Sequence, residues 1–405
     1  MNCRRSICAA LLALTAVSAR GDDFMDRLDE ALTFSSEDGQ YRARISGLLD
    51  LEYYQLTGNA PGLIYTDDNH LFNSRLSLFL DSQLGPAFYF FSQARLDQGF
   101  DPSDAPLETR LEEYAVRWTP WEDGRFNLQV GRFATVVGNQ VERHGSWENP
   151  FINAPLIYEN VTRIYDAYAP QYPSDFAGSV AGAKYEYNPV IWGPSYATGL
   201  SVSGKLGQFG YAAEIKNASL SSRPESWDAT DGGFSNPTLS TRISWRPDMA
   251  WEFGFSASEG AYLTDEARGS LPDGTGLSDF KQQVLGQDAA FSWGHWQIWA
   301  EVYEARFDVP NVGNADTLGY YIEAKYKFTP GLAGALRWNQ QLFDDVPDGK
   351  GGEEPWGHDI SRIDAAVTYR FTPEMQVKLQ YSLQHEDHAE DDISQLAAGQ
   401  VTVRF

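Results

Sequence analysis

One long segment, residues 134–176, concentrates the charged side chains best placed to act on ions. These are Arg143, His144, Glu148, Glu159, Arg163 and Asp166. Fixed charges act most strongly on an ion in a narrow passage, because little water remains there to screen them. The segment is also too rich in apolar residues to stay solvated, so we expect it to fold onto another surface. We predict a constriction at these six residues; the alternative is a loop that packs on a neighbouring subunit or on an outer rim.

A second set of charges occupies alternate positions of extended segments, and alternation places them on one face. A wall that carries both signs of charge produces a transverse field that orients polar solutes, and it favours anions where bases cluster. The alternative is that these charges pair with one another and merely fill the space. The candidates are Arg75, Arg95, Arg117, Glu301, Glu323, Lys325, Arg337, Arg362, Asp364, Arg370 and Lys378.

Signals for catalysis or cofactor binding are weak. The sequence contains neither a phosphate-binding Gly-x-x-x-x-Gly-Lys-Ser/Thr loop nor a Gly-x-Ser-x-Gly elbow. The acidic run at 385–392, with its two histidines, could bind a divalent cation. Its position between two extended segments instead favours an acidic surface loop. We predict neither an enzyme nor a resident metal or cofactor.

The elements that must position the charges are extended segments in which apolar and polar residues alternate. Residues 318–328, 362–371 and 375–384 all follow this pattern. In a soluble β-sandwich the apolar face would pack on a second sheet. In a membrane β-barrel it would face lipid, and the polar face would line water. Alternation alone leaves both architectures open.

Connection lengths favour the barrel, because short and long connections alternate along the chain. Four tight turns also place an aromatic residue two positions before proline, where an amphipathic ring suits a membrane interface; these are Trp118, Trp245, Phe328 and Phe371. The tight connections are 85–86, 120–124, 247–248, 294, 330–331 and 373–374, and the long ones are 56–69, 99–108, 220–237, 259–280, 308–316, 343–358 and 386–392.

These patterns predict an all-β fold, a transmembrane antiparallel β-barrel over residues 41–405 with residues 134–176 folded inward. Such barrels close with an even number of strands. The number is sixteen if residues 177–187 belong to a loop and residues 189–206 form one strand, and eighteen if residues 156–165 contain another. We prefer sixteen.

The N-terminus indicates export. Residues 1–19 combine a basic start, a short apolar stretch and small residues before Ala19, as in a secretory signal peptide. Cys3 and Cys8 are the two cysteines of the sequence and lie in this peptide, so the exported chain would have no disulfide. Residues 20–40 form a short N-terminal segment with helical spacing, expected in the periplasm as a cap, a small plug or a frayed leader.

The net charge and the C-terminus narrow the possible partners. The net charge of −25 argues against nucleic-acid binding. Alternation continues to the last residue, Phe405, and this ending is similar to the terminal strand of Gram-negative outer-membrane barrels. That similarity implies that Phe405 is an assembly signal for the barrel assembly machinery.

The signal peptide, the aromatic C-terminal strand and the segment 128–133, which leads into a long loop, resemble those of porins, in particular the phosphate-selective porin O/P type. The resemblance implies a sixteen-stranded barrel, usually a homotrimer, in the outer membrane of a Gram-negative bacterium. It would contact lipid and lipopolysaccharide and pass small hydrophilic solutes or ions. The sequence lacks the dense basic run of phosphate-selective members. The alternative function is a non-conducting barrel that acts as a surface adhesin or envelope structural protein.

Overall fold

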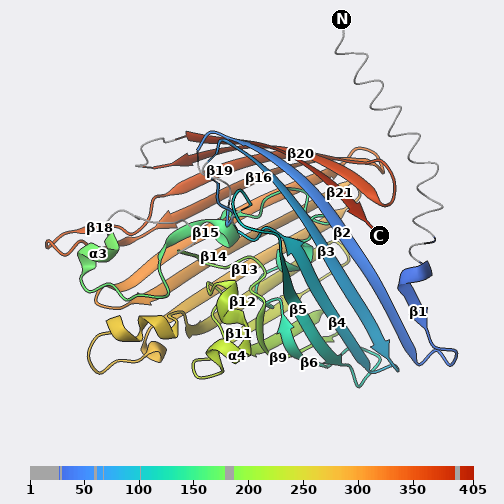
Figure 1. Cartoon of the computed structure of the whole chain (residues 1–405), viewed down its shortest axis with the longest axis horizontal. Helices are drawn as coiled ribbons and strands as arrows, with labels where there is room; N and C mark the ends of the chain where they lie inside the picture. The colour runs from blue at the N-terminus through green and yellow to red at the C-terminus, as the bar shows by residue number, and fades with distance from the viewer. Residues whose placement is uncertain are drawn as a thin grey trace, which may run out of the picture.

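The computed structural model describes residues 27, 30–58, 62–66, 68–100, 102–177, 187–387 and 393–405 (Figure 1). The expected signal peptide lies outside these residues, and so does part of the acidic run at 385–392. Residues 30–32 are helical within the expected N-terminal segment, most of which also lies outside the described part.

One antiparallel sheet closes on itself as a barrel of sixteen strands. Closure comes from β2, which pairs with β3 on one edge and with the last strand, β21, on the other. A short strand, β1 (Thr33–Ser35), adds to β2 beyond the end of β21. The predicted fold class and the preferred strand number are therefore confirmed. The barrel strands are β2 (Tyr41–Leu56), β3 (His70–Leu84), β4 (Phe88–Asp97), β5 (Glu108–Trp118), β6 (Asn127–Phe133), β9 (Ala197–Leu206), β10 (Phe209–Lys216), β11 (Thr238–Trp245), β12 (Trp251–Ala261), β13 (Lys281–Trp293), β14 (Trp296–Val309), β15 (Gly313–Lys327), β16 (Leu332–Phe343), β19 (Ile360–Arg370), β20 (Met375–Glu386) and β21 (Ile393–Arg404).

The burial pattern of the barrel strands is the reverse of that in a soluble protein: their polar side chains are buried and their apolar ones are exposed. Strand β20 shows this clearly: Lys378 and Gln380 are buried, whereas Leu379 and Tyr381 are exposed. Side chains of a strand alternate between its two faces, so the buried polar set points into the barrel. The exposed apolar set forms an outer surface suited to lipid.

Short turns connect the strands at one end of the barrel and long loops at the other. In Figure 1, α3 and β18 lie at the long-loop end, and the C-terminus lies toward the opposite end. Small elements of the long loops are η3 (Pro224–Trp227), α4 (Ala229–Gly232), η4 (Asp265–Ser270), η5 (Leu277–Asp279), β17 (Asp345–Pro347) and β18 (Glu353–Pro355). The short turns are 85–87, 119–126, 207–208, 246–250, 294–295, 328–331 and 371–374.

One expected long loop is a tight hairpin. The sequence predicted a polar connection over residues 308–316, but β14 and β15 leave only residues 310–312 between them. Asn311 and Gly313 have φ angles of 61° and 114°, which permit the sharp reversal. The polar residues mistaken for a loop continue the ladder, with Asp308 paired to Asn314.

Aromatic side chains surround the barrel at the short-turn end. The four aromatic residues that precede proline are all exposed there, as are Trp121, Trp251, Trp293 and Trp296. Several stack in pairs, for example Trp251 with Phe253, whose ring centroids are 5.4 Å apart. Rings with an apolar body and a polar edge are favoured at a membrane–water boundary. The short-turn end therefore has the composition of an interfacial belt.

The last residue closes the barrel through its backbone and its side chain. The Phe405 amide donates to the Gly47 carbonyl at 3.1 Å, and the Gly47 amide donates to the Phe405 carbonyl at 2.9 Å. A β-carbon added at Gly47 would collide with the Phe405 ring. Glycine is required at this position because the ring of the neighbouring strand covers it.

We expect Gly47→Ala to destabilise the folded barrel by about 1–3 kcal/mol, because the Phe405 ring must move to admit the methyl group. Urea unfolding in detergent, followed by the gel shift between folded and boiled protein, measures this. The control is Gly276→Ala, where an added β-carbon meets no atom within 4 Å. Equal midpoints for the two variants would contradict the packing argument.

Candidate functional site

The connection between β6 and β9 folds into the barrel, as predicted. It is longer than expected, running from residue 134 to residue 196 rather than to 176, because β9 begins only at Ala197. Residues 189–196, expected to begin a strand, belong to this connection, which we call the inner loop. Its elements are η1 (Val141–Arg143), α2 (Leu156–Glu159), β7 (Val161–Ile164), α3 (Pro173–Ala177) and β8 (Asn188–Pro189).

Glu301 on β14 anchors the start of the inner loop. One carboxylate oxygen accepts the amides of Asn139 and Gln140 at 2.5 and 3.1 Å. The other accepts the Tyr158 hydroxyl at 2.7 Å. Burial, followed by the nearby Glu301 charge, raises the pKa of Tyr158 well above its usual value, so this phenol stays a neutral donor. Glu301 thus holds two separate parts of the inner loop against one strand.

Arg143, a predicted constriction residue, extends from η1 to the wall formed by β14 and β15, next to Glu301. Its guanidinium forms an ion pair with Glu323 at 2.5 Å and donates to the Tyr321 hydroxyl at 2.8 Å. It also stacks on Trp299, 4.4 Å from the ring centroid. Arg143 is therefore fixed in place and is not a mobile charge.

A buried ionic network links the inner loop to β16 and β19. Asp364 accepts from Arg337 at 2.8 Å and from Arg362 at 3.4 Å. Arg362 also pairs with Glu159 of the inner loop at 2.7 Å. Arg337 donates to the side-chain oxygen of Asn153 at 2.8 Å. The side chains of Arg337 and Asp364 are fully buried, so each charge depends on its partners for stabilisation.

Three of the predicted lumen arginines contact polar or acidic side chains of their own or a neighbouring strand. Arg75 pairs with Asp50 and Glu52 at 3.1 and 2.9 Å. Arg95 lies within 3.8 Å of Asp97 and 3.7 Å of Glu112. Arg117 donates to Gln129 at 2.9 Å. Arg75 and Arg95 therefore fit the alternative interpretation, in which the lumen charges pair with one another.

The remaining constriction candidates lie at different depths. Asp166 is buried in a two-point ion pair with Arg223 of the next long loop, at 2.6 and 3.2 Å. The charge of Arg163 interacts with that of Glu354 at the long-loop end. His144 accepts or donates to Tyr196 at 2.8 Å, and burial lowers the pKa of its imidazole. Among the six candidates, Arg143 and Glu148 line an open cavity, and Glu159 and Asp166 fasten the inner loop.

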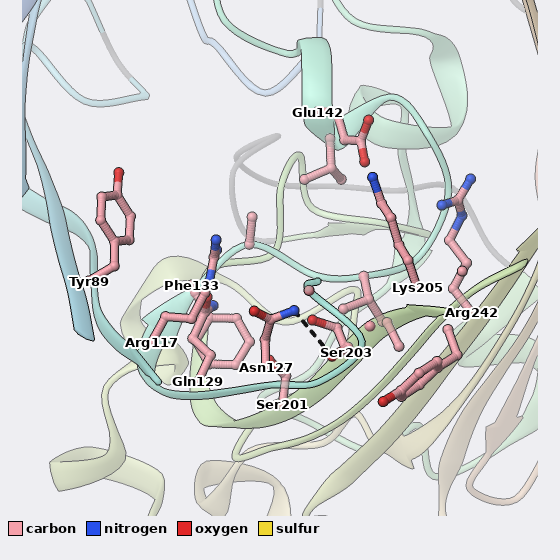
Figure 2. Close-up of a pocket in the computed structure, with 18 of the residues that line it drawn as sticks. Tyr89, Arg117, Asn127, Gln129, Phe133, Glu142, Ser201, Ser203, Lys205 and Arg242 are labelled. Atoms are coloured by element: carbon pink, nitrogen blue, oxygen red, sulfur yellow. Dashed lines mark hydrogen bonds between the residues drawn. The ribbon is translucent and has the colours of Figure 1, made fainter. Parts of the chain in front are cut away.

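Below the inner loop, toward the short turns, lie two water-accessible cavities of about 1010 and 540 Å³. The larger cavity, in Figure 2, has Tyr89 and Arg117 on one side and Lys205 and Arg242 on the other. Glu142 of the inner loop points toward these two bases (Figure 2). Glu142, Arg242 and Glu252 line both cavities, so they mark the boundary between them.

The sequence did not single out Glu142, Lys205 or Arg242. Lys205 and Arg242 belong to the same alternating pattern as the predicted wall residues, so register could have revealed them. Glu142 is adjacent to Arg143 in the charged segment, but its orientation depends on how the inner loop turns. Together they place opposite charges across the space under the loop.

Above the cavities, at the long-loop end, apolar side chains from several loops pack together inside the barrel. Members of this cluster include Ile157, Ile164, Val190, Tyr262 and Trp356, all almost fully buried. They come from segments far apart in the sequence, so the inner loop and the loops that follow β12 and β16 pack against one another. We call these residues the loop core.

No described helix is long and apolar enough to cross a membrane. Within the described ranges, three or more His, Cys, Asp or Glu residues nowhere gather as metal ligands would.

A family model described as “Putative MetA-pathway of phenol degradation” matches residues 167–400. No curated protein matches the sequence. Solved structures with a similar fold include the outer-membrane channel DcaP of Acinetobacter baumannii (TM-score 0.57, 11% identity, 92% of this chain and 99% of that chain). Others are OmpF of Salmonella typhi in complex with daunomycin (0.56, 12%, 92% and 100%) and an anion-selective porin from Comamonas acidovorans (0.51, 10%, 90% and 99%). At these identities the likeness establishes a porin-like barrel fold.

Proposed function

The chain belongs to the family described as “Putative MetA-pathway of phenol degradation”, and from this membership and its porin-like barrel we propose that it is an outer-membrane channel for passive diffusion of small hydrophilic solutes or ions. The observation that carries the proposal is the inner loop, which is held against the inner wall of the barrel and has charged, water-accessible cavities beside it. A purely structural barrel has no need for open cavities of this size under a loop fixed by buried ion pairs.

The constriction in this proposal lies where Glu142 faces Lys205 and Arg242. Opposite charges across a narrow passage orient a dipolar or charged solute, because the field acts where water is scarce. Arg143 and Glu148 continue the charged lining toward the second cavity. Arg163 and Asp166, nearer the long loops, support the position of the inner loop.

The orientation and assembly of the channel follow from the same proposal. The short turns face the periplasm and the long loops face the exterior, in contact with lipopolysaccharide, as in bacterial outer-membrane barrels. The protein reaches the outer membrane of a Gram-negative bacterium after removal of residues 1–19. Phe405 serves as a signal for the assembly machinery, and three copies form a homotrimer.

Reconstitution into planar bilayers tests the channel. We expect discrete conductance steps from the wild-type barrel, and larger steps when residues 145–152 are replaced by a Gly-Ser linker of equal length. The replacement removes the side chains that occupy the lumen, including Trp147 and Phe151, and leaves the length of the inner loop unchanged. Folding of both proteins is verified by heat-modifiable gel migration. Folded proteins that both remain silent would overturn the proposal.

A second candidate, a non-conducting barrel with a structural or adhesive role, is favoured by one observation. The loop core fills the interior at the long-loop end with almost fully buried apolar residues. A wild-type barrel that is folded and silent, and a loop replacement that is also silent, would support this candidate. Conduction by the replacement alone would instead indicate a channel closed by its inner loop.

A further inference from the structure

Four basic side chains around the smaller cavity form no ion pair with any described residue. They are Lys325, Lys327, Arg370 and Lys378. Over the described part of the chain, none of the four lies within ion-pair distance of a carboxylate, although most other lumen arginines do. In a protein with a net charge of −25, four neighbouring unpaired bases are unexpected.

Glu142, Glu148 and Glu252 also line the cavity, but among the described residues they form no ion pair with these four bases, and Lys378 shows this lack of direct contact most clearly. Its side chain is only 1% exposed, and its amino group donates to the carbonyl oxygens of Ser146 and Phe151. Arg370 makes one long contact with the Gln376 amide oxygen at 3.4 Å. Carbonyl groups satisfy the hydrogen bonds of a buried cation but do not neutralise its charge. An anion bound in the cavity would make direct contacts with these bases.

The strand register explains why these bases surround empty space. Lys327 pairs with Ala333 on β16, which pairs with Thr368 on β19, which pairs with Lys378 on β20. Two strands with small inward side chains thus separate the lysines of β15 from that of β20. The small residues leave the volume that the cavity occupies, and the long basic side chains project around it.

The cavity also has an aromatic lining. Trp147 of the inner loop and Trp299 of β14 both contribute to it. Arg370 and Arg404 approach the Trp147 ring at 4.9 and 4.4 Å from its centroid, which orients the indole. A cavity of about 540 Å³ that combines indole surface with a few charged groups is typical of a site for a small organic molecule.

We propose that this cavity binds an organic monoanion with an apolar ring, of the arenecarboxylate class. The carboxylate lies among Lys325, Lys378 and Arg370, and the ring lies against the indoles of Trp147 and Trp299. This rests on the proposed function in one respect: a channel would give such a solute access to the site. The binding itself does not require conduction.

The test is calorimetric titration of the folded wild-type barrel in detergent with benzoate. Benzyl alcohol serves as the neutral analogue with the ring, and acetate as the anion without it. We expect saturable binding of benzoate and at least about tenfold weaker binding of either analogue, because each lacks one of the two interactions. Because the titration needs no bilayer, a silent channel that binds benzoate refutes the proposed function and leaves this site intact.

Substitutions locate the site. Lys325→Gln, which keeps the size of a half-buried side chain, is expected to weaken benzoate binding about tenfold. Lys378→Gln should do the same, and heat-modifiable migration shows whether it folds. The control is Lys350→Gln in the exposed β17–β18 turn, which should bind like wild type. Absence of saturable binding, equal binding of benzyl alcohol, or unchanged binding in Lys325→Gln would each overturn the proposal.

Discussion

Replacing Asp364 with alanine is expected to destabilise the folded barrel by about 3–5 kcal/mol, because it removes one partner of a buried ion pair and leaves the other without compensation. Asp364 is fully buried and also accepts from Asn339 at 2.8 Å and from Ser382 at 2.5 Å. After the substitution, the remaining ion pairs of the two arginines among the described residues are Arg337 with Glu323 at 3.6 Å and Arg362 with Glu159 at 2.7 Å, and Glu323 already pairs with Arg143. Two guanidinium groups would then share an interior that no longer balances their charge.

Urea unfolding of the detergent-folded protein, read by tryptophan fluorescence and by gel migration, measures this loss. Asp364→Asn keeps the shape of the side chain and should show an intermediate loss. The matched control is Asp273→Ala in an exposed loop, where we expect a change within about 0.5 kcal/mol. An Asp364→Ala barrel as stable as the control would mean that water or a rearranged neighbour compensates the arginines.

Asp364 is a buried residue of β19, and it was included among the predicted wall residues because alternation with period two determines which side chains share a face. Strand β20 illustrates the same success: its polar residues are buried and its apolar residues are exposed. Alternation does not determine which residue of the next strand lies opposite. The partnership of Asp364 with Arg337 depends on the register of β16 against β19, which a single sequence does not specify.

The inner loop was predictable as an inward segment but not in its details. Its apolar residues required a surface to cover, and the interior of the barrel supplies one. Its end at residue 196 was missed because residues 189–196 are mostly apolar, like a strand. In the structure this segment turns, with φ angles of 49° at Gly193 and 47° at Ser195, and Val190 and Ile191 pack within the loop core. Glu142 was missed because the direction of an irregular segment depends on contacts with distant strands, not on local periodicity.

The second large effect is expected at Glu301, where substitution should release the inner loop from the wall. Glu301→Ala removes an ionised acceptor of three hydrogen bonds, two from backbone amides and one from Tyr158. Bonds to a charged group contribute about 1.5–3 kcal/mol each, so the docked loop should lose at least about 3 kcal/mol. The released fraction should then rise more than about 100-fold.

Single-channel recording measures this release as larger or more frequent openings than those of wild type. Glu304→Ala is the matched control, because Glu304 lies on the same strand but is exposed on its outer face. Glu301→Gln, which keeps one amide oxygen as an acceptor, should fall between the two. If Glu301→Ala folds and its openings equal those of Glu304→Ala, then the anchors that remain, Arg143 with Glu323 and Glu159 with Arg362, suffice to hold the loop. The position of the inner loop would in that case depend on many contacts of similar strength, and Glu301 would not be its main anchor.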